Sequence, residues 1–157
     1  MLKIPSKASI VISTILSVLF LSGCLIGAFF LPQATNALID AKYIVNGYEY
    51  ITAQNRMVIH ALSYVVLADV VVADILLFFL LIRVKSGEVF TKKSVALIRG
   101  VSWCCIILGL VFAVIGLYFY ISFIVAFAAL FLGICIRVVK NVIEQATEIK
   151  QENDLTV

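Results

Sequence analysis

The second apolar segment of the chain reads HALSYVVLADVVVADILLFFLLIR and carries two carboxyl groups, Asp69 and Asp74. An ionisable side chain at the bilayer centre costs roughly 2.5–3.5 kcal/mol on insertion scales, so such residues face other helices and find polar partners there. In a helix the two residues lie about 140° apart around the axis and about 7.5 Å apart along it, so we expect them to use different neighbours. Two interpretations stay open: a proton or cation relay, or hydrogen bonds to Ser, Tyr or backbone groups that fix helix packing.

His60 begins the same segment, where the outer loop joins it. As part of a relay it would stand near the outer mouth. About 21 Å of helix axis separates it from Asp74, which excludes a direct contact between the two side chains. A relay therefore needs an intervening group, and the alternative interpretation of His60 is an ordinary interfacial residue.

The rest of the chain lacks the patterns on which most enzymes depend. It has one histidine, no glycine-rich phosphate loop, no Cys or His residues at metal-ligand spacing and no Ser–base–acid pattern outside the apolar segments. The four cysteines lie inside apolar runs, where we expect them to be reduced and to act as small hydrophobic residues. The sequence predicts no catalysis, no metal and no cofactor.

Composition places these side chains in lipid. Hydrophobic residues make up 64% of the 157 residues and charged residues 13%, against roughly 45–50% and about 25% in soluble domains. A soluble fold of this size exposes too much surface to hide so many apolar side chains. We therefore expect a multi-pass protein of the cell membrane.

Four segments are long enough to cross the bilayer as helices, which takes about 20 apolar residues each. The first stops at Pro32, and the last two share one uncharged run that must fold back near residues 116–122. The sequence thus predicts an all-α integral membrane four-helix bundle forming a single domain. Its expected parts are spans at about 8–31, 57–82, 101–118 and 121–139, an outer loop at 32–56, a cytoplasmic elbow at 83–100 and a cytoplasmic tail at 140–157.

The letters LSGC at residues 21–24 form, taken alone, a lipobox that would make Cys24 the site of a lipid anchor. However, the apolar run continues about two turns beyond Cys24, whereas the apolar region of a signal peptide ends at its cleavage site. Ser22, Gly23 and Gly27 are typical of a helix face that packs closely on another helix. We therefore expect an uncleaved first span, with a lipid anchor as the alternative.

Basic residues predict the direction of the spans, because the cytoplasmic loops of membrane proteins are rich in Lys and Arg. Ten of the twelve lie in the N-terminal segment, the elbow and the tail, and only Lys42 and Arg56 lie in the outer loop. Both termini are therefore expected in the cytoplasm.

The outer loop contains Asn46 and Gly47 with tyrosines on either side. The Asn-Gly pair is typical of a hairpin turn. The alternative, which we favour, is that the tyrosines belong to the aromatic belt at the outer headgroups. They are Tyr43, Tyr48 and Tyr50.

The elbow sequence KSGEVFTKKSVALIRG contains a set of helix-end signals. Gly87 can end the second helix in the left-handed conformation, and Thr91 is a good N-cap for the third. Phe90 is placed to form a hydrophobic staple with the fourth helical residue. We expect a stiff joint at the inner surface, with Lys92 and Lys93 facing anionic headgroups. It is either a plain capped turn or a specific site for a lipid or a protein.

The tail RVVKNVIEQATEIKQENDLTV is predicted to continue the fourth span into the cytoplasm as an amphipathic helix. Acidic residues are poor ligands for the inner leaflet, so we expect its apolar stripe to pack on protein, either on the basic elbow or on a partner. The last three residues also resemble a C-terminal carboxylate ligand, or are a plain chain end. The stripe is Val139, Val142, Ile143, Ala146 and Ile149, and the candidate interaction residues are Glu144, Glu148, Glu152, Asp154 and Leu155.

Two stretches, GEVFTKKSVALIR and the terminal QENDLTV, resemble a known family. They are similar to the G-x-x-F-T elbow and the E-N-D-L-T-[VI] ending of domain of unknown function family 2975, which are small four-span bacterial membrane proteins. The chain departs from that pattern at Val89, where the family usually has Pro, and at Ser94, where it often has Asn. The resemblance implies no settled activity, but members are often encoded beside a small helix-turn-helix regulator, which implies such a regulator as a partner.

Our interpretation is a non-enzymatic regulatory or interaction protein that presents its elbow and acidic tail to a cytoplasmic protein, such as a helix-turn-helix transcription regulator held at the membrane by charge complementarity. The alternatives are a small proton- or cation-coupled transporter or immunity-type factor that uses Asp69 and Asp74, and an accessory subunit that only packs helices. The expected partners are the lipid bilayer and this cytoplasmic protein, without direct binding of nucleic acid. Transport would need a homo-oligomer, because four short spans leave little room for a pathway.

Overall fold

The computed structural model describes residues 6–40 and 53–155, which form four long helices and no strand. The helices are α1 (Ser6–Asp40), α2 (Ala53–Lys85), α3 (Lys92–Gly116) and α4 (Ile121–Leu155). Each is long and apolar enough to cross a membrane. The predicted all-α fold with four spanning helices is confirmed, and it indicates a multi-pass membrane protein. The reversal between α3 and α4 falls at residues 117–120, inside the predicted stretch.

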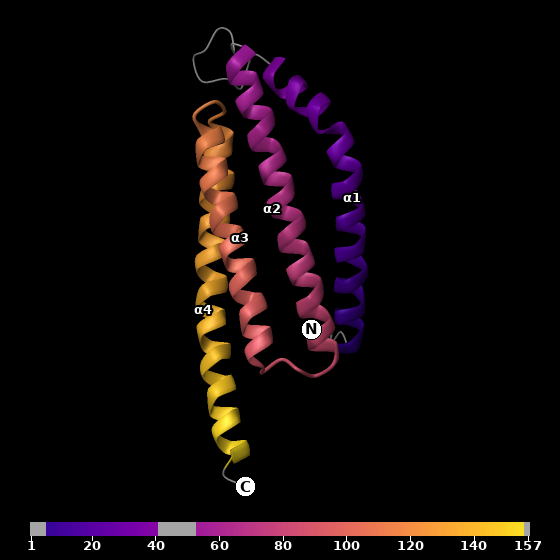
Figure 1. Ribbon diagram of the computed structural model, residues 1–157, viewed down its shortest axis with the longest axis vertical. Helices are drawn as coiled ribbons and strands as arrows, with labels where there is room; N and C mark the ends of the chain where they lie inside the picture. Colours follow the sequence, from indigo (N-terminus) through magenta and orange to yellow (C-terminus); the bar gives the residue numbers. More distant parts are fainter. Residues whose placement is uncertain (1–5, 41–52, 156–157) are drawn as a thin grey trace, which may run out of the picture.

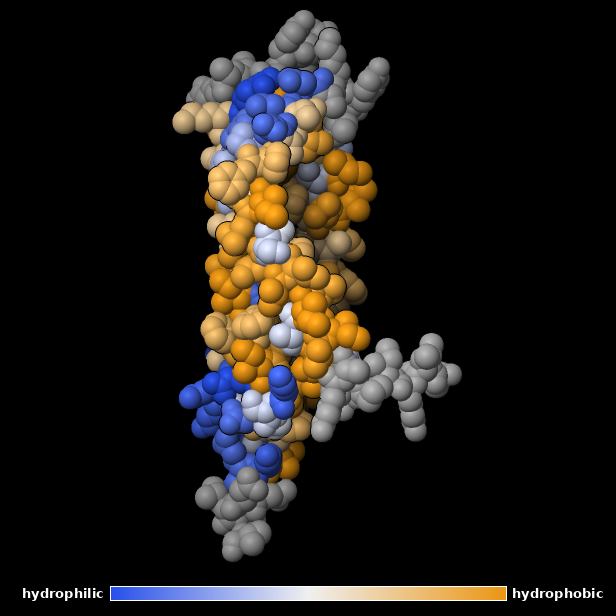
Figure 2. All heavy atoms as spheres, turned by 90° about the vertical axis from the view of Figure 1, so that its right-hand side faces the viewer, coloured by the Kyte–Doolittle hydropathy of each residue, from blue (hydrophilic) through white to orange (hydrophobic). Residues whose placement is uncertain are grey.

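The helices lie side by side in chain order (Figure 1). Within the described residues, close backbone contacts join α1 to α2, α2 to α3 and α3 to α4, and none joins α1 to α3 or to α4. The molecule is therefore an open row of helices, with the start of α1 and the end of α4 at the same end (Figure 1). On the side formed by α1, an apolar band separates polar side chains at the two ends, as expected of a chain whose middle lies in lipid (Figure 2).

Helices α3 and α4 approach most closely, because glycines lie at their contact. A Cβ atom on Gly109 would come within 2.6 Å of Cγ of Leu130, and one on Gly133 within 2.9 Å of Cγ1 of Ile106. Ser102 is almost fully buried and donates a 2.9 Å hydrogen bond from its Oγ to the carbonyl oxygen of Gly133. Small residues that let backbones approach are a usual means of packing helices in lipid.

Helix α1 does not stop at Pro32, where we expected the first span to end, but continues to Asp40. A proline removes one backbone donor from a helix and bends it, and α1 curves toward α2 beyond this point (Figure 1). The curved part continues as helix because it packs on the neighbouring helices. Its Ile39 joins a buried cluster with Ile59 of α2 and with Ile115 and Phe119 at the α3–α4 reversal.

Arg56 holds the end of α1 beside the start of α2. Its Nη2 lies 2.9 Å from Oδ1 of Asp40, and its Nη1 donates a 2.9 Å hydrogen bond to Oδ1 of Asn36. These contacts join the end of α1 to the start of α2 across the segment that connects them. The predicted hairpin turn or aromatic belt at residues 43–50 lies outside the described residues.

The joint between α2 and α3 has the predicted helix-end geometry. Gly87 follows the end of α2 with a φ of +79°, the left-handed region that glycine enters most readily. Thr91 caps α3 from an extended conformation, and its Oγ1 accepts a 3.2 Å hydrogen bond from the backbone N–H of Ser94. The buried hydroxyl of Ser94 in turn donates to the carbonyl oxygen of Glu88 at 2.7 Å. Since both helix ends are hydrogen-bonded, the joint fixes the direction of α3 relative to α2.

Candidate functional site

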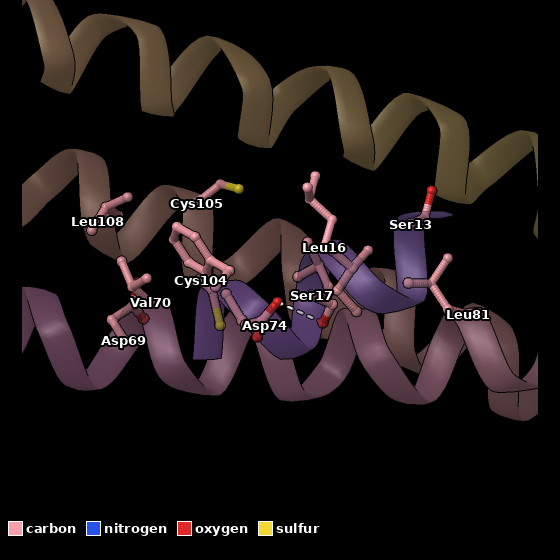
Figure 3. A pocket seen from close by; sticks show the side chains of 14 residues that line it. Ser13, Leu16, Ser17, Asp69, Val70, Asp74, Leu81, Cys104, Cys105 and Leu108 are labelled. Atoms are coloured by element: carbon pink, nitrogen blue, oxygen red, sulfur yellow. Dashed lines mark hydrogen bonds between the residues drawn. The ribbon is translucent and has the colours of Figure 1, made fainter. Parts of the chain in front are cut away.

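A cavity of about 480 Å³ lies between α1, α2 and α3, at the level of the apolar band. It exists because α1 and α3 both pack on α2 without close backbone contact with each other. Its lining is almost entirely apolar, and the two carboxyl groups of α2 face it (Figure 3). The lining residues on which the argument depends are Ser13, Ser17 and Phe20 of α1, Asp69 and Asp74 of α2, and Cys104 of α3.

Asp74 is held against α1. The residue is 7% exposed, and its Oδ1 accepts a 2.8 Å hydrogen bond from Oγ of Ser17 (Figure 3). Asp74 lies about 16 Å along the helix axis from the end of α2 at Lys85, so this bond forms inside the hydrocarbon. A carboxyl group without a partner is very costly in that medium. Ser17 therefore satisfies Asp74 and ties α1 to α2.

Asp69 turns toward α3 instead. Its carboxyl group interacts with the thiol of Cys104. The two carboxyl groups thus use different neighbours, as their angular separation on a helix predicts. Both carboxyl groups line the same cavity, although they have different partners.

His60 is not brought to the two carboxyl groups. Its Nδ1 lies 2.8 Å from the carbonyl oxygen of Arg56, one turn earlier in the same helix. It is partly exposed at the loop end of α2 and does not line the cavity. This position is that of an interfacial residue, and a direct relay from His60 to Asp74 has no contact in the structure.

Sequence reasoning missed the part that α1 contributes to the cavity. Ser17 and Ser13 both line it, although neither was singled out. A signal was present: Ser9, Ser13 and Ser17 recur every four residues and so occupy one face of an otherwise apolar helix. Cys104 was read only as a small hydrophobic residue, because its place beside a carboxyl group depends on another helix.

The last part of α4 runs beyond the membrane boundary. About 34 Å of helix axis separates Ile121 from Glu144, which exceeds the hydrocarbon thickness of about 30 Å. Before this point the guanidinium of Arg137 lies 4.6 Å from the ring centroid of Trp103 on α3. Trp and Arg gather where a span meets the headgroups, so Glu144 lies outside the lipid core.

Glu144 joins the tail to the elbow. Its Oε1 accepts a 3.1 Å hydrogen bond from Nη2 of Arg99, near the start of α3, and its Oε2 accepts one from Nζ of Lys140. The hydrogen bond from Lys140, followed by the positive charges of Lys140 and Arg99, lowers the pKa of Glu144 below its ordinary value. Opposite charges of elbow and tail therefore meet.

Within the described residues the contact of the tail with α3 is centred on Thr147 rather than on the apolar stripe, and packing of the stripe on a partner protein stays a prediction. Thr147 is the buried residue of this contact, and beside it a cavity of about 230 Å³ is lined in part by Lys92, Arg99 and Glu144. Ile143 and Ala146 of the stripe are partly buried. Three residues of the stripe are more than half exposed: Val139, Val142 and Ile149.

The model of a family described as protein of unknown function, DUF2975, matches residues 4–157, essentially the whole chain. The chain belongs to the DUF2975 family. No curated protein and no solved structure matches it. Membership confirms the resemblance of the elbow and the tail and assigns no activity.

Several of the elbow residues by which the chain resembles DUF2975 form the joint between α2 and α3. Gly87 and Thr91 shape the joint, while Lys92 and Lys93 stay exposed on it. Phe90 is 44% exposed, and the staple with the fourth residue of α3 stays a prediction. Ser94, at the position where the family often has Asn, supplies the hydroxyl that bonds back to the turn.

The remaining predicted tail residues are only partly described. Glu148 and Glu152 are exposed on α4, and the side chains of Asp154 and Leu155 lie outside the described residues. Over residues 6–40 and 53–155, no group of three or more His, Cys, Asp or Glu side chains has a geometry that could hold a metal ion.

Proposed function

We propose that this membrane protein acts without catalysis, as an interaction protein that presents an elbow–tail surface to a cytoplasmic protein. The observation that supports this most is the 3.1 Å ion pair between Arg99 and Glu144, because it joins two segments distant in the sequence into one surface. The elbow–tail surface consists of Lys92, Arg99, Glu144, Glu148 and Gln151, which line the 230 Å³ cavity between α3 and α4.

The proposal places this surface in the cytoplasm, because ten of the twelve Lys and Arg residues lie on its side of the predicted spans. There Glu148 lies exposed beside the paired Glu144 on one face of α4. A partner with a basic surface would be attracted to this face by charge complementarity. A helix-turn-helix regulator has such a surface, because it neutralises phosphates when it binds DNA. Held against the tail, that surface would be unavailable to DNA.

The test is equilibrium binding of a helix-turn-helix regulator, the kind of partner that the family resemblance implies, to the full-length protein in phosphatidylcholine nanodiscs. We expect binding that weakens as salt is raised, because charge pairs at a solvated surface are screened. Glu148→Lys should weaken it several-fold, since it places a like charge against the basic partner. The matched control is Asp40→Lys, which makes the same change of charge, from −1 to +1, at an exposed position at the opposite end of the molecule.

Deleting residues 144–157 should abolish the interaction. A regulator that binds equally well without these residues would rule out the elbow–tail surface. A regulator that does not bind the intact protein would rule out this class of partner.

Cation- or proton-coupled transport is a second candidate function, favoured by the shared cavity of Asp69 and Asp74. Acidic side chains in a lipid-embedded cavity can exchange protons or hold a cation. The test is ion flux into vesicles that contain the purified protein, with Asp74→Asn expected to abolish it and Asp40→Asn, at an exposed position, expected to leave it unchanged. Flux that is absent at every pH, or identical in both variants, would exclude this function.

A further inference from the structure

The apolar walls of the cavity between α1, α2 and α3 fit a small hydrophobic molecule. Its volume of about 480 Å³ falls within the range of roughly 300–1,000 Å³ that is typical of ligand sites. Such sites combine apolar walls with a few convergent polar groups, and this cavity has both. The walls are formed by Leu16 and Phe20 of α1, Leu77 and Leu81 of α2, and Leu108 of α3.

The polar groups of the cavity are acidic and retain acceptor capacity. Ser17 donates to one oxygen of Asp74, Oδ1, and a carboxylate offers about four acceptor sites in all. Asp69 lies about 7.5 Å further along α2 and faces the same space. Among the described residues that line this cavity there is no Lys, Arg or His. No side chain of the lining therefore supplies a cation to either carboxyl group.

This charge pattern distinguishes between possible occupants. A lipid acyl chain would fill the apolar walls but would offer no donor to the carboxyl groups. A primary ammonium group carries a positive charge and three N–H donors, and hydrogen bonds between ionised partners are roughly twice as strong as neutral ones. Because α1 and α3 are not in close contact, a molecule dissolved in the bilayer can reach the cavity from the side.

We propose that this cavity is a binding site for a lipophilic amine, whose ammonium group is held by Asp74 and Asp69 and whose apolar part lies against the leucines and Phe20. The site is separate from the elbow–tail surface, and binding to it requires no transport. It lies where two carboxyl groups, one of them 7% exposed, face a cavity that no basic side chain enters.

The experiment measures equilibrium binding of radiolabelled dodecylamine to the full-length protein in phosphatidylcholine nanodiscs, with empty nanodiscs subtracted. Dodecanol serves as the uncharged probe of equal chain length. We expect saturable binding of dodecylamine and an affinity at least about tenfold lower for dodecanol and for Asp74→Asn, because each loses a charge-assisted hydrogen bond. Asp40→Asn is the matched control, because it makes the same change at an exposed residue outside the cavity.

Equal affinities of wild type and Asp74→Asn would overturn the proposal, and so would equal affinities for the amine and the alcohol. Either result would mean that the pairing of the ammonium group with Asp74 does not contribute to binding, as expected for an uncharged occupant such as an acyl chain. Binding no greater than that of empty nanodiscs would overturn it as well. The regulator-binding test measures binding at the elbow–tail surface, and the flux test measures ion movement across the membrane. Each of these two tests and the amine-binding test can therefore fail without the others.

A second readout does not depend on how Asp74→Asn folds. In a Cys24→Ala, Cys135→Ala background the remaining thiols, Cys104 and Cys105, both line the cavity. Saturating dodecylamine should slow their labelling by N-ethylmaleimide several-fold, and dodecanol at the same concentration should not. Unchanged labelling rates with dodecylamine would also overturn the proposal.

Discussion

At the scale of single residues, the Ser17–Asp74 hydrogen bond is the contact on which the membrane cavity depends. Ser17 is 5% exposed and Asp74 is 7% exposed, so water does not replace the bond if it is lost. Hydrogen bonds between helices in lipid contribute about 0.6 kcal/mol on average and up to about 1.7 kcal/mol. This bond should lie toward the upper value, because its acceptor is a buried carboxyl group.

Ser17→Ala should therefore lower the free energy of unfolding by about 1–2 kcal/mol, the cost of leaving a buried acceptor unpaired. The measurement is unfolding in mixed micelles, followed by the fluorescence of Trp103. Ser22→Ala is the control: Ser22 lies on the same helix, is exposed, and donates only to the carbonyl oxygen of Leu19 within its own helix. Equal effects of the two substitutions would contradict the role given to Ser17.

At the scale of elements, the α3–α4 hairpin and the tail are each held by contacts of a different kind. In the hairpin, backbone proximity at Gly109 and Gly133 provides the contact. In the tail, the exposed ion pair of Glu144 with Arg99 provides part of it. The first kind is insensitive to pH and salt, whereas the second kind is screened by salt and depends on ionisation.

Gly109→Ala should destabilise the hairpin by about 1–3 kcal/mol, the typical cost of overpacking. The new Cβ would meet Cγ of Leu130 at 2.6 Å and the carbonyl oxygen of Ala126 at 3.1 Å. Gly27→Ala is the control, because no atom lies within 4 Å of its Cβ position, and alanine favours a helix over glycine by roughly 0.5–1 kcal/mol. Thermal unfolding of both variants in detergent should show a lower melting temperature for Gly109→Ala and an unchanged or higher one for Gly27→Ala. An unchanged melting temperature for Gly109→Ala would contradict close packing at this position.

The contact between the tail and the elbow should weaken in acid. The pKa of Glu144 is lowered in the folded state, so its contribution is fully present above the ordinary pKa of a glutamate and is lost as the pH falls through the lowered value. Hydrogen exchange of residues 144–152 should therefore accelerate at pH 3 relative to pH 7, after correction for intrinsic rates. Glu144→Gln should remove this difference, and a tail that responds equally in both proteins would place the cause elsewhere.

At the scale of the whole molecule, the open row decides what each helix can contact. Among the described helices, α1 has close backbone contacts with α2 alone and α4 with α3 alone. The row leaves the membrane cavity beside α1 and the elbow–tail surface at the other side of the molecule, where α3 meets α4. The two sites therefore share no residue, and we expect substitutions in one to leave binding at the other unchanged.

The orientation of the four helices in the membrane, with both termini in the cytoplasm, is predicted from the distribution of Lys and Arg. In a cysteine-free background, Ser86→Cys in the joint and Gln151→Cys in the tail should react with a membrane-impermeant maleimide only after the cells are opened, because we expect both in the cytoplasm. Asn55→Cys, near the start of α2, should react in intact cells. Reaction of Ser86→Cys and Gln151→Cys from opposite sides would contradict four complete crossings.

The sequence alone was sufficient for features that depend on neighbouring residues. Long uncharged runs form helices in lipid because the backbone must satisfy its own hydrogen bonds there. The left-handed Gly87 and the Thr91 cap also follow from local conformational preference, and the divergent directions of Asp69 and Asp74 follow from the pitch of one helix.

Only the tertiary structure decided which helices touch and which faces they use. Ser17 became the partner of Asp74, and Cys104 that of Asp69, because α1 and α3 lie on either side of α2. The tail packs through Thr147 and Glu144 because the approach of α3 selects that side, although the apolar stripe was the stronger sequence signal. The reason is that periodicity orients each helix only about its own axis, and in lipid an apolar face can meet either a neighbouring helix or the bilayer at similar cost.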